Sequence, residues 1–200
     1  SMVMQLVAPR LMVMGGGAAA KLADVLAQLG LSRPLVVTDP FMVSSGMAER
    51  ALAPLRAAGM APAVFADTVP DPTDTVIEAG VAAMRAGDFD CLIGFGGGSP
   101  MDVAKLAAYL LGSGDELDSI WGVGLARGAR LPLALVPTTA GTGSEATPVA
   151  VITVEGAEKR GVNSPALVAD WAVLDAGLTV GMPRGLTAAT GIDAIVHAVE

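Results

Sequence analysis

The chain has 200 residues, of which 52% are apolar and only 4% are aromatic. Alanine, valine, leucine and glycine therefore supply most of the core, as they do in layered α/β proteins. The net charge of −8 argues against nonspecific nucleic-acid binding, which depends on lysine and arginine at phosphates. One cysteine cannot form an internal disulfide bond. No apolar run is long enough for a bilayer, and no signal-peptide pattern is present, so we expect a cytoplasmic protein.

Short apolar runs alternate with alanine- and leucine-rich segments over the first 140 residues. The expected strands are residues 11–14, 35–38, 61–65, 91–95 and 133–136. The expected helices between them are residues 18–29, 47–58, 74–86 and 100–111. This alternation predicts an α/β fold with a Rossmann-like, mainly parallel sheet and helices on both faces.

The pattern changes in the last third of the chain. Residues 147–154 are expected to form a strand because they are rich in β-branched side chains, and 172–174 is a second candidate. Residues 185–200 are expected to be helical, with Pro183 near the start of the helix. We therefore expect an α/β domain over residues 1–180. Residues 181–200 would begin an all-helical domain that continues in the natural protein.

Two glycine-rich turns compete as phosphate sites. Gly15–Ala20 satisfies the pattern G-x-G-x-x-A between a predicted strand and a predicted helix, and Asp39 follows near the spacing of the dinucleotide fingerprint. Gly96–Asp102 has the same setting, with Ser99 as an additional donor and Pro100 at the helix start. Either turn would bring backbone N–H groups and a helix N-terminus to an anion. A simple tight turn is the alternative interpretation of each.

A hydroxyl-rich segment follows the strand that ends near residue 136. Pro137–Glu145 contains four hydroxyl side chains and two glycines in nine residues. Hydroxyls and free amides at the carboxyl end of a strand suit phosphate or ribose contacts, because open α/β sheets bind ligands at that edge. A threonine-rich structural loop is the alternative.

The last candidate site is the pair Asp193 and His197. In a helix, residues four positions apart share a face, so the carboxylate and the imidazole would point the same way. Such a pair suits a divalent metal. The alternative is an aspartate near a helix N-terminus together with a histidine that is satisfied within the fold.

Three of these segments together resemble one known family. The strings GGGSPMDVAK (Gly96–Lys105), PTTAGTGSE (Pro137–Glu145) and GIDAIVHAVE (Gly191–Glu200) are similar, in order and spacing, to motifs of the iron-containing, group III alcohol dehydrogenases. The resemblance covers nearly the whole chain, which corresponds to the N-terminal half of such an enzyme. It implies an NAD(P)-binding α/β domain, an all-helical metal domain, and a cleft between the two.

The resemblance also implies roles for individual residues. It puts the pyrophosphate at Gly97, Gly98 and Ser99, and it leaves Gly15–Gly17 as a turn. The other implied cofactor contacts are Asp39 at the adenosine ribose, Asp102 near the nicotinamide, Thr138, Thr139, Thr142 and Ser144 along the cleft, and Lys159 near the nicotinamide ribose. Asp71 departs from the family, which often has asparagine there, and this puts the adenine-side contact in doubt.

By the same resemblance, Asp193 and His197 are the first two of four ligands to Fe²⁺ or Zn²⁺. The other two are histidines further along the family's chain, and His197 is the only histidine here, so we expect these 200 residues alone to be inactive. The implied activity is hydride transfer between a small alcohol or aldehyde and NAD. The metal would act as a Lewis acid, without a protein nucleophile. Asp39 favours NAD over NADP.

Other readings of the sequence stay open. The chain could act only as a nucleotide-binding fragment without activity. It could also belong to a related metal enzyme, such as a glycerol dehydrogenase or a dehydroquinate synthase, although the stretch from Thr138 to Glu145 favours the alcohol dehydrogenase branch. The resemblance further implies a homodimer or higher oligomer. No nucleic acid and no membrane is expected as a partner.

Overall fold

The computed structural model describes residues 9, 11–14, 17–139, 143–154 and 158–178. The strands are β1 (Leu11–Met14), β2 (Pro34–Val37), β3 (Ala63–Phe65), β4 (Cys91–Gly96), β5 (Gly122–Val123), β6 (Leu133–Pro137), β7 (Val149–Val154), β8 (Glu158–Asn163) and β9 (Trp171–Leu174). The α-helices are α1 (Ala18–Gln28), α2 (Pro40–Ser44), α3 (Glu49–Ala57), α4 (Asp74–Arg85) and α5 (Gly98–Ser113). Single 3₁₀ turns are η1 (Leu117–Ser119), η2 (Ser144–Ala146) and η3 (Pro165–Leu167).

Six strands form the main sheet, in the order β1-β9-β6-β4-β2-β3, and every adjacent pair is parallel. The predicted Rossmann-like parallel sheet is therefore confirmed. Because parallel strands end at the same edge, the segments that follow β2, β4 and β6 meet there. This edge carries Asp39, the glycine turn at Gly97, and Thr138 and Thr139 after Pro137.

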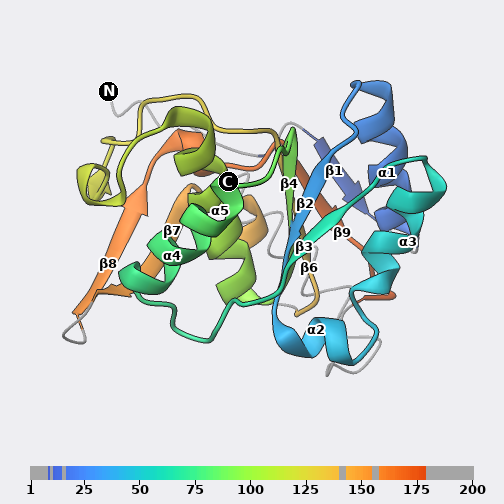
Figure 1. Cartoon of the computed structure of the whole chain (residues 1–200), viewed down its shortest axis with the longest axis horizontal. Coiled ribbons are helices and arrows are strands. Elements are labelled where there is room, and N and C mark those ends of the chain that lie inside the picture. The colour runs from blue at the N-terminus through green and yellow to red at the C-terminus, as the bar shows by residue number, and fades with distance from the viewer. Residues whose placement is uncertain (1–8, 10, 15–16, 140–142, 155–157, 179–200) are drawn as a thin grey trace, which may run out of the picture.

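Helices cover both faces of this sheet, α1 and α3 on one side and α4 and α5 on the other (Figure 1). Successive strand residues alternate between the two layers, as the pleat requires. Val36 and Ile93 pack with α1 and α3, whereas Leu35 and Leu92 pack with α4 and α5. Both faces of β2 and β4 are buried, which explains why their sequences are continuous apolar runs.

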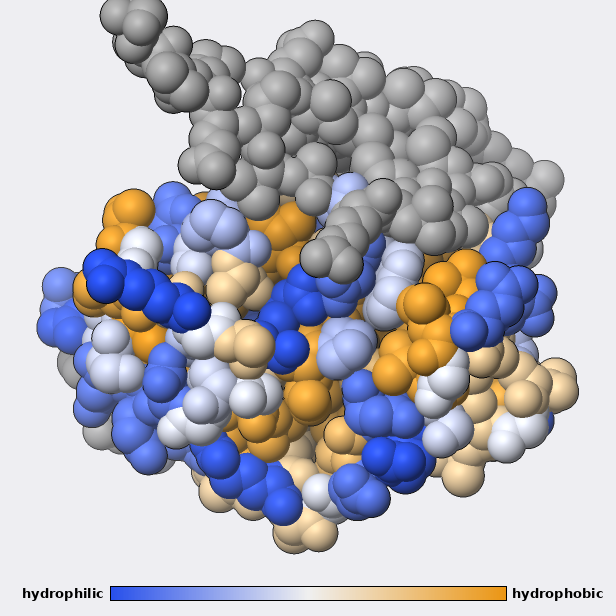
Figure 2. All heavy atoms as spheres, turned by 90° about the horizontal axis from the view of Figure 1, so that it is seen from above, coloured by the Kyte–Doolittle hydropathy of each residue, from blue (hydrophilic) through white to orange (hydrophobic). Residues whose placement is uncertain are grey.

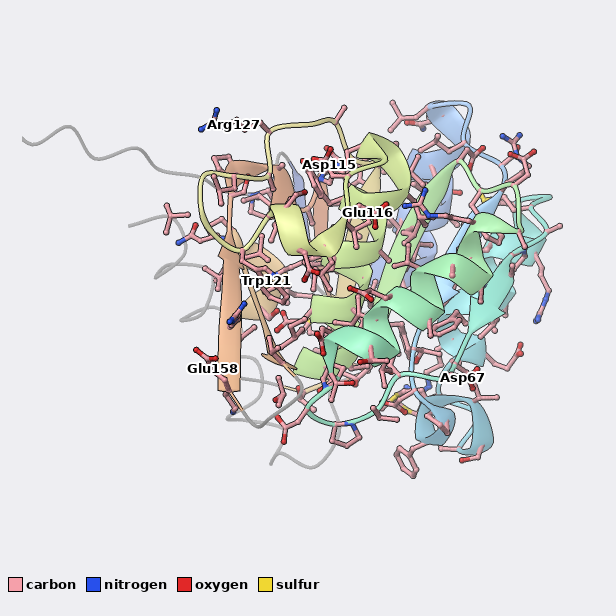
Figure 3. All side chains as sticks on the ribbon, turned by 60° about the vertical axis from the view of Figure 1, so that its left-hand side comes forward. Asp67, Asp115, Glu116, Trp121, Arg127 and Glu158 are labelled. Atoms are coloured by element: carbon pink, nitrogen blue, oxygen red, sulfur yellow. The ribbon has the colours of Figure 1, made fainter. Side chains whose placement is uncertain are left out.

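A second, three-stranded sheet has the order β5-β8-β7, with β7 and β8 antiparallel. Its inner face carries Ala150, Ile152 and Val162, which belong to the same core cluster as α5. At its outer edge the Arg160 guanidinium lies 6.0 Å from the ring centroid of Trp121, which is labelled in Figure 3. The second sheet therefore packs against α5, in the layer that α4 and α5 form.

The sequence predictions for the described elements are correct within a few residues at most ends. The strands expected at 147–154 and 172–174 are β7 and β9. Helix α5 begins at Gly98, two residues before the predicted start. Helix α2 and strand β8 were not predicted, because α2 has only five residues and the first half of β8 is charged and exposed. The helix expected over 185–200 lies outside the described residues.

Polar and apolar residues are interspersed over the face shown in Figure 2. Among the described residues, no helix has the length and apolar character needed to cross a membrane. Large exposed apolar side chains include Phe41, Val43 and Val69. Two of these, Phe41 and Val69, line the candidate site described next.

Candidate functional site

The turn between β4 and α5 leaves the first turn of α5 open. Gly96 has φ +141°, which side chains rarely adopt, and a Cβ there would lie 2.9 Å from the Cγ atom of Pro100. Gly97 is the N-cap of α5, and a glycine has no side chain that could cap the helix. A Cβ added at Gly98 would meet no described atom within 4 Å. Free N–H groups and the positive end of the helix dipole therefore face open space, which suits an anion.

Two pockets meet at this helix N-terminus, since Gly98 and Ser99 line both of them. The larger has a volume of about 460 Å³ and is lined by Asp39–Phe41, Thr68–Pro70 and Gly97–Pro100. The smaller, of about 210 Å³, is lined by Asp71, Pro72, Gly98, Ser99, Asp102, Val151–Thr153 and Lys159. We call the two pockets together the α5 groove. It offers an elongated ligand one anion site in the middle and a pocket on either side.

The other glycine-rich turn leads to a helix that is already capped. The backbone N–H of Ala19, in the first turn of α1, donates to the Asp175 carboxylate at 3.3 Å. The other oxygen of this buried carboxylate accepts from the N–H of Gly177 at 2.9 Å. A protein carboxylate thus takes the position that a phosphate would need at α1. This geometry favours Gly96–Ser99 over Gly15–Ala20 as the phosphate site.

Two buried threonines flank the open turn. Thr38 follows β2 and Thr138 follows β6, and both side chains are 0% exposed. Within the described part of the chain, neither Oγ1 atom has a hydrogen-bond partner. A buried hydroxyl without a partner destabilises a fold by about 1–3 kcal/mol. A polar ligand at the carboxyl edge of the sheet is one group that could satisfy them.

Asp39 stands at the entrance to the larger pocket and also caps a helix. Its Oδ1 accepts the N–H of Met42 at 2.8 Å, which fixes the start of α2. Helix α2 in turn presents Phe41 to the pocket, opposite Val69 and Pro70. Asp67, which is labelled in Figure 3, directly precedes the lining residues Thr68–Pro70 in the chain. The larger pocket therefore has apolar walls and one carboxylate at its rim.

Asp102, which lines the smaller pocket, belongs to a largely buried polar network. The Asp102 carboxylate accepts the Ser144 hydroxyl at 3.0 Å through Oδ1 and the Val151 N–H at 3.2 Å through Oδ2. The ammonium of Lys105, 0% exposed, lies 3.8 Å from Asp102 Oδ1. Burial lowers the pKa of Lys105 to about 8, and burial also raises the pKa of the Asp102 and Glu145 carboxyls. Asp102 and Ser144 thus act as a connected pair.

Charged side chains line the smaller pocket from two further elements. Lys159 lies on β8 and is exposed, and Asp71 lies in the segment before α4. Asp71 has φ +46°, the one positive φ among the described residues other than glycine. Asparagine and aspartate tolerate this conformation best. A lysine at one end of the groove can neutralise part of the charge of a diphosphate ligand.

The structure brings most of the predicted site residues together. Six of them, Asp39, Gly97, Gly98, Ser99, Asp102 and Lys159, line the α5 groove. Three others adjoin it: Ser144 bonds Asp102, Thr138 is buried beside the turn, and the Thr139 hydroxyl would lie 3.7 Å from a Cβ at Gly97. Thr142, Asp193 and His197 lie outside the described residues. Among the residues that are described, no group of His, Cys, Asp and Glu is arranged to hold a metal ion.

Sequence reasoning missed two residues at this site. Lys105 stands inside the motif GGGSPMDVAK, but nothing in a sequence distinguishes a buried lysine from an exposed one. Its spacing of three residues from Asp102 could have suggested an ion pair on one helix face. Thr38 precedes Asp39 and could have been found as a hydroxyl at the end of a predicted strand.

Comparison with known proteins identifies the family. The family model for iron-containing alcohol dehydrogenases matches residues 9–176. Long-chain-alcohol dehydrogenase 1 of Geobacillus thermodenitrificans is 43% identical, over 99% of this chain and 51% of that protein. The alcohol dehydrogenase from Oenococcus oeni superposes with a TM-score of 0.86 at 34% identity, over 99% of this chain and 52% of that one.

A further solved structure is the sulfoacetaldehyde reductase from Bifidobacterium kashiwanohense in complex with NAD⁺. It has a TM-score of 0.80 and 33% identity, over 96% of this chain and 51% of that one. The chain thus spans about half the length of each of these relatives. By its motifs, its fold and these similarities, the chain belongs to the iron-containing alcohol dehydrogenase family.

Proposed function

We propose that the full-length protein is an NAD-dependent, metal-dependent alcohol dehydrogenase that transfers hydride between a small alcohol or aldehyde and the nicotinamide. The observation that carries this proposal is the glycine-started N-terminus of α5, which lies between two adjoining pockets. The family assignment supports an oxidoreductase acting on alcohols or aldehydes. The solved relative with NAD⁺ supports the choice of cofactor.

The α5 groove fits an extended dinucleotide. The N–H groups at Gly98 and Ser99 would hold the diphosphate, because the N-cap Gly97 leaves the helix end open to a ligand. The larger pocket, with Phe41 and Val69, would take the adenosine, whose ribose hydroxyls could donate to Asp39. The smaller pocket would take the nicotinamide ribose beside Lys159.

The protein's main contribution to the reaction is positioning. When bound, the nicotinamide supplies the hydride acceptor, and a divalent metal supplies the Lewis acidity that favours the alkoxide form of the alcohol. Hydrogen bonds from Ser144 and the Val151 N–H keep Asp102 in the smaller pocket fixed, so that the nicotinamide end of the dinucleotide has one orientation. Asp193 and His197 are the proposed metal ligands, by resemblance, together with ligands outside these 200 residues. No protein nucleophile is needed.

Steady-state kinetics of the full-length protein test the proposal. We expect NADH formation from a panel of primary alcohols with Fe²⁺ or Zn²⁺ present, and loss of turnover after chelation or in His197→Ala. NADH should still bind to His197→Ala, because the described residues that line the α5 groove include neither of the proposed metal ligands. Turnover that survives both treatments would contradict metal dependence. Absence of NAD(H) binding to the wild type would contradict the cofactor assignment.

Two further expectations belong to the proposal. We expect the 200-residue chain alone to bind Zn²⁺ only weakly, because a catalytic site usually takes three or more protein ligands and only Asp193 and His197 are candidates. Calorimetry showing tight, stoichiometric binding that disappears in His197→Ala would contradict this. We also expect a cytoplasmic homodimer or higher oligomer, which fractionation and light scattering would test.

A further inference from the structure

Lys105 is a fully buried charged residue of α5 that lies outside the proposed cofactor contacts. Its ammonium donates to the Ser144 Oγ at 3.1 Å, the Thr147 Oγ1 at 3.2 Å and the Val149 carbonyl at 2.9 Å. An ammonium has three N–H donors, so all three are satisfied. All three acceptors belong to one segment, residues 143–149, which we call the η2 segment. Lys105 itself lies on α5.

A buried ammonium destabilises the fold unless all of its N–H donors are hydrogen-bonded. Moving an ammonium out of water costs several kcal/mol, and only full hydrogen bonding with nearby opposite charge offsets this. Here Asp102 lies on the same helix face, and Glu145, which is 4% exposed, contributes a second carboxylate from the η2 segment. The network is satisfied in one placement of the segment relative to α5. A shift of the η2 segment would leave a buried charge with unused donors.

This placement determines the shape of the smaller pocket. Asp102 and Val151 both line that pocket, and the Val151 N–H donates to Asp102 directly after the segment that Lys105 holds. Asp102 and Lys105 lie one turn apart on α5. Together they form hydrogen bonds with four residues of the following segment, at positions 144, 147, 149 and 151. The wall formed by β7 is held at a fixed distance from Ser99 by these contacts.

We propose that Lys105 is a positioning residue for the nicotinamide end of the α5 groove: it holds the η2 segment and β7 against α5, and so sets the width of the smaller pocket. The inference rests on the proposed function, because it takes that pocket as part of the cofactor site. Lys105 itself does not line either pocket and is not expected to touch the cofactor.

The test uses Lys105→Met in the full-length protein, with Tyr109→Phe as its matched control. Tyr109 is also fully buried on α5, and its hydroxyl bonds Asp115 and the Gly128 N–H, on the far side from the groove. We expect Lys105→Met to raise the Kd for NADH about tenfold or more, whereas Tyr109→Phe changes it by less than about twofold. Both variants should lose thermal stability. Equal Kd values in wild type and Lys105→Met would show a merely structural lysine and overturn the proposal.

Two more measurements keep the test decisive. If Lys105→Met does not fold, Thr147→Val removes one acceptor of the ammonium and should raise the Kd for NADH about threefold. An unchanged Kd in that variant overturns the proposal.

Hydrogen exchange separates this inference from the proposed function, because it needs no cofactor. Faster exchange of the amides over 144–151, but not over α1, in either variant supports the positioning role even if the wild type binds no NADH. Unchanged exchange there overturns it.

Discussion

The two glycine-rich turns of this molecule look alike in sequence but differ in what their helices already bind. Helix α1 receives the buried Asp175 carboxylate at the N–H of Ala19, whereas α5 starts from Gly97, which has no side chain, and opens between two pockets. Both helices carry the same partial positive charge at their N-termini. The difference lies in Asp175, which is 156 positions from Ala19 in the sequence. A glycine motif therefore predicts a possible anion site, and the rest of the fold decides whether a protein carboxylate occupies it.

The largest expected effect separates the two turns directly. Gly98→Val places a side chain in space that is open in the described structure and where the diphosphate is proposed to lie. We expect the Kd for NADH to rise about a hundredfold, or roughly 2.7 kcal/mol. The free energy of unfolding should change little, since a Cβ at Gly98 contacts no described atom. NADH fluorescence titration and urea unfolding measure the two quantities.

Ala20→Val is the matched control for that variant. Ala20 is exposed in the first turn of α1 and is the last residue of the rival G-x-G-x-x-A pattern. We expect NADH affinity to stay within about twofold of the wild type. Equal losses in both folded variants would restore Gly15–Ala20 as a dinucleotide site.

Asp39 sharpens the comparison, because this carboxylate caps a helix and also borders the α5 groove. Its Oδ1 caps α2, and its Oδ2 would lie 3.6 Å from a Cβ at Gly96. A carboxylate there would repel the 2′-phosphate of NADP by about 1–3 kcal/mol, or roughly tenfold to a hundredfold in affinity. We expect Asp39→Gly to improve kcat/KM for NADP about tenfold while much of the NAD activity remains.

Asp39→Ser distinguishes the two roles of this residue. Serine can still cap α2 but carries no charge, so it should gain NADP use without the small loss of stability expected for Asp39→Gly, roughly 0.3 kcal/mol. If neither variant gains activity with NADP, or if the wild type already uses both cofactors equally, then Asp39 does not select the cofactor.

Removing the cap of α1 tests the other side of the comparison. Asp175→Asn replaces one acceptor oxygen by an NH₂ group and removes the negative charge at the helix N-terminus. We expect the free energy of unfolding to fall by about 1–2 kcal/mol. NADH affinity of the folded protein should be unchanged. A large loss of NADH binding without a loss of stability would mean that the turn before α1 binds the cofactor, and that Asp175 is more than a helix cap.

Regular patterns made most of the fold predictable from the sequence. The strands β2, β4 and β6 are short apolar runs between helices, and a buried parallel sheet requires such runs. Strand β8 escaped prediction because its exposed first half, Glu158–Arg160, has no apolar periodicity, and its pairing with β7 decides its structure. Helix α2 depends on a single cap, Asp39, and is too short to show a period.

Site residues that the local backbone pattern determines could be predicted from the sequence. Site residues whose role depends on tertiary contacts could not. Gly97, Gly98 and Ser99 were expected, because a strand, a glycine turn and a helix start follow one another in the sequence. Lys105 was missed, because its burial depends on acceptors from residues 144–149, about 40 positions later. The Asp175 cap of α1 was missed for the same reason. Long-range polar contacts leave no periodic signal in a sequence.

The smallest expected effect concerns Asp71, which faces the α5 groove with a charge of the same sign as a diphosphate. It lines the smaller pocket together with Ser99 and Asp102 and has φ +46°. Asp71→Asn removes the charge and keeps a residue that tolerates this conformation, so stability should change little. An exposed like charge near a ligand costs a few tenths of a kcal/mol to about 1 kcal/mol, so we expect NADH to bind about threefold more tightly. The gain should shrink at high salt, because screening weakens the repulsion in the wild type. An affinity that falls in Asp71→Asn would show that the carboxylate accepts a hydrogen bond from the cofactor, and would make Asp71 a contact residue of the smaller pocket.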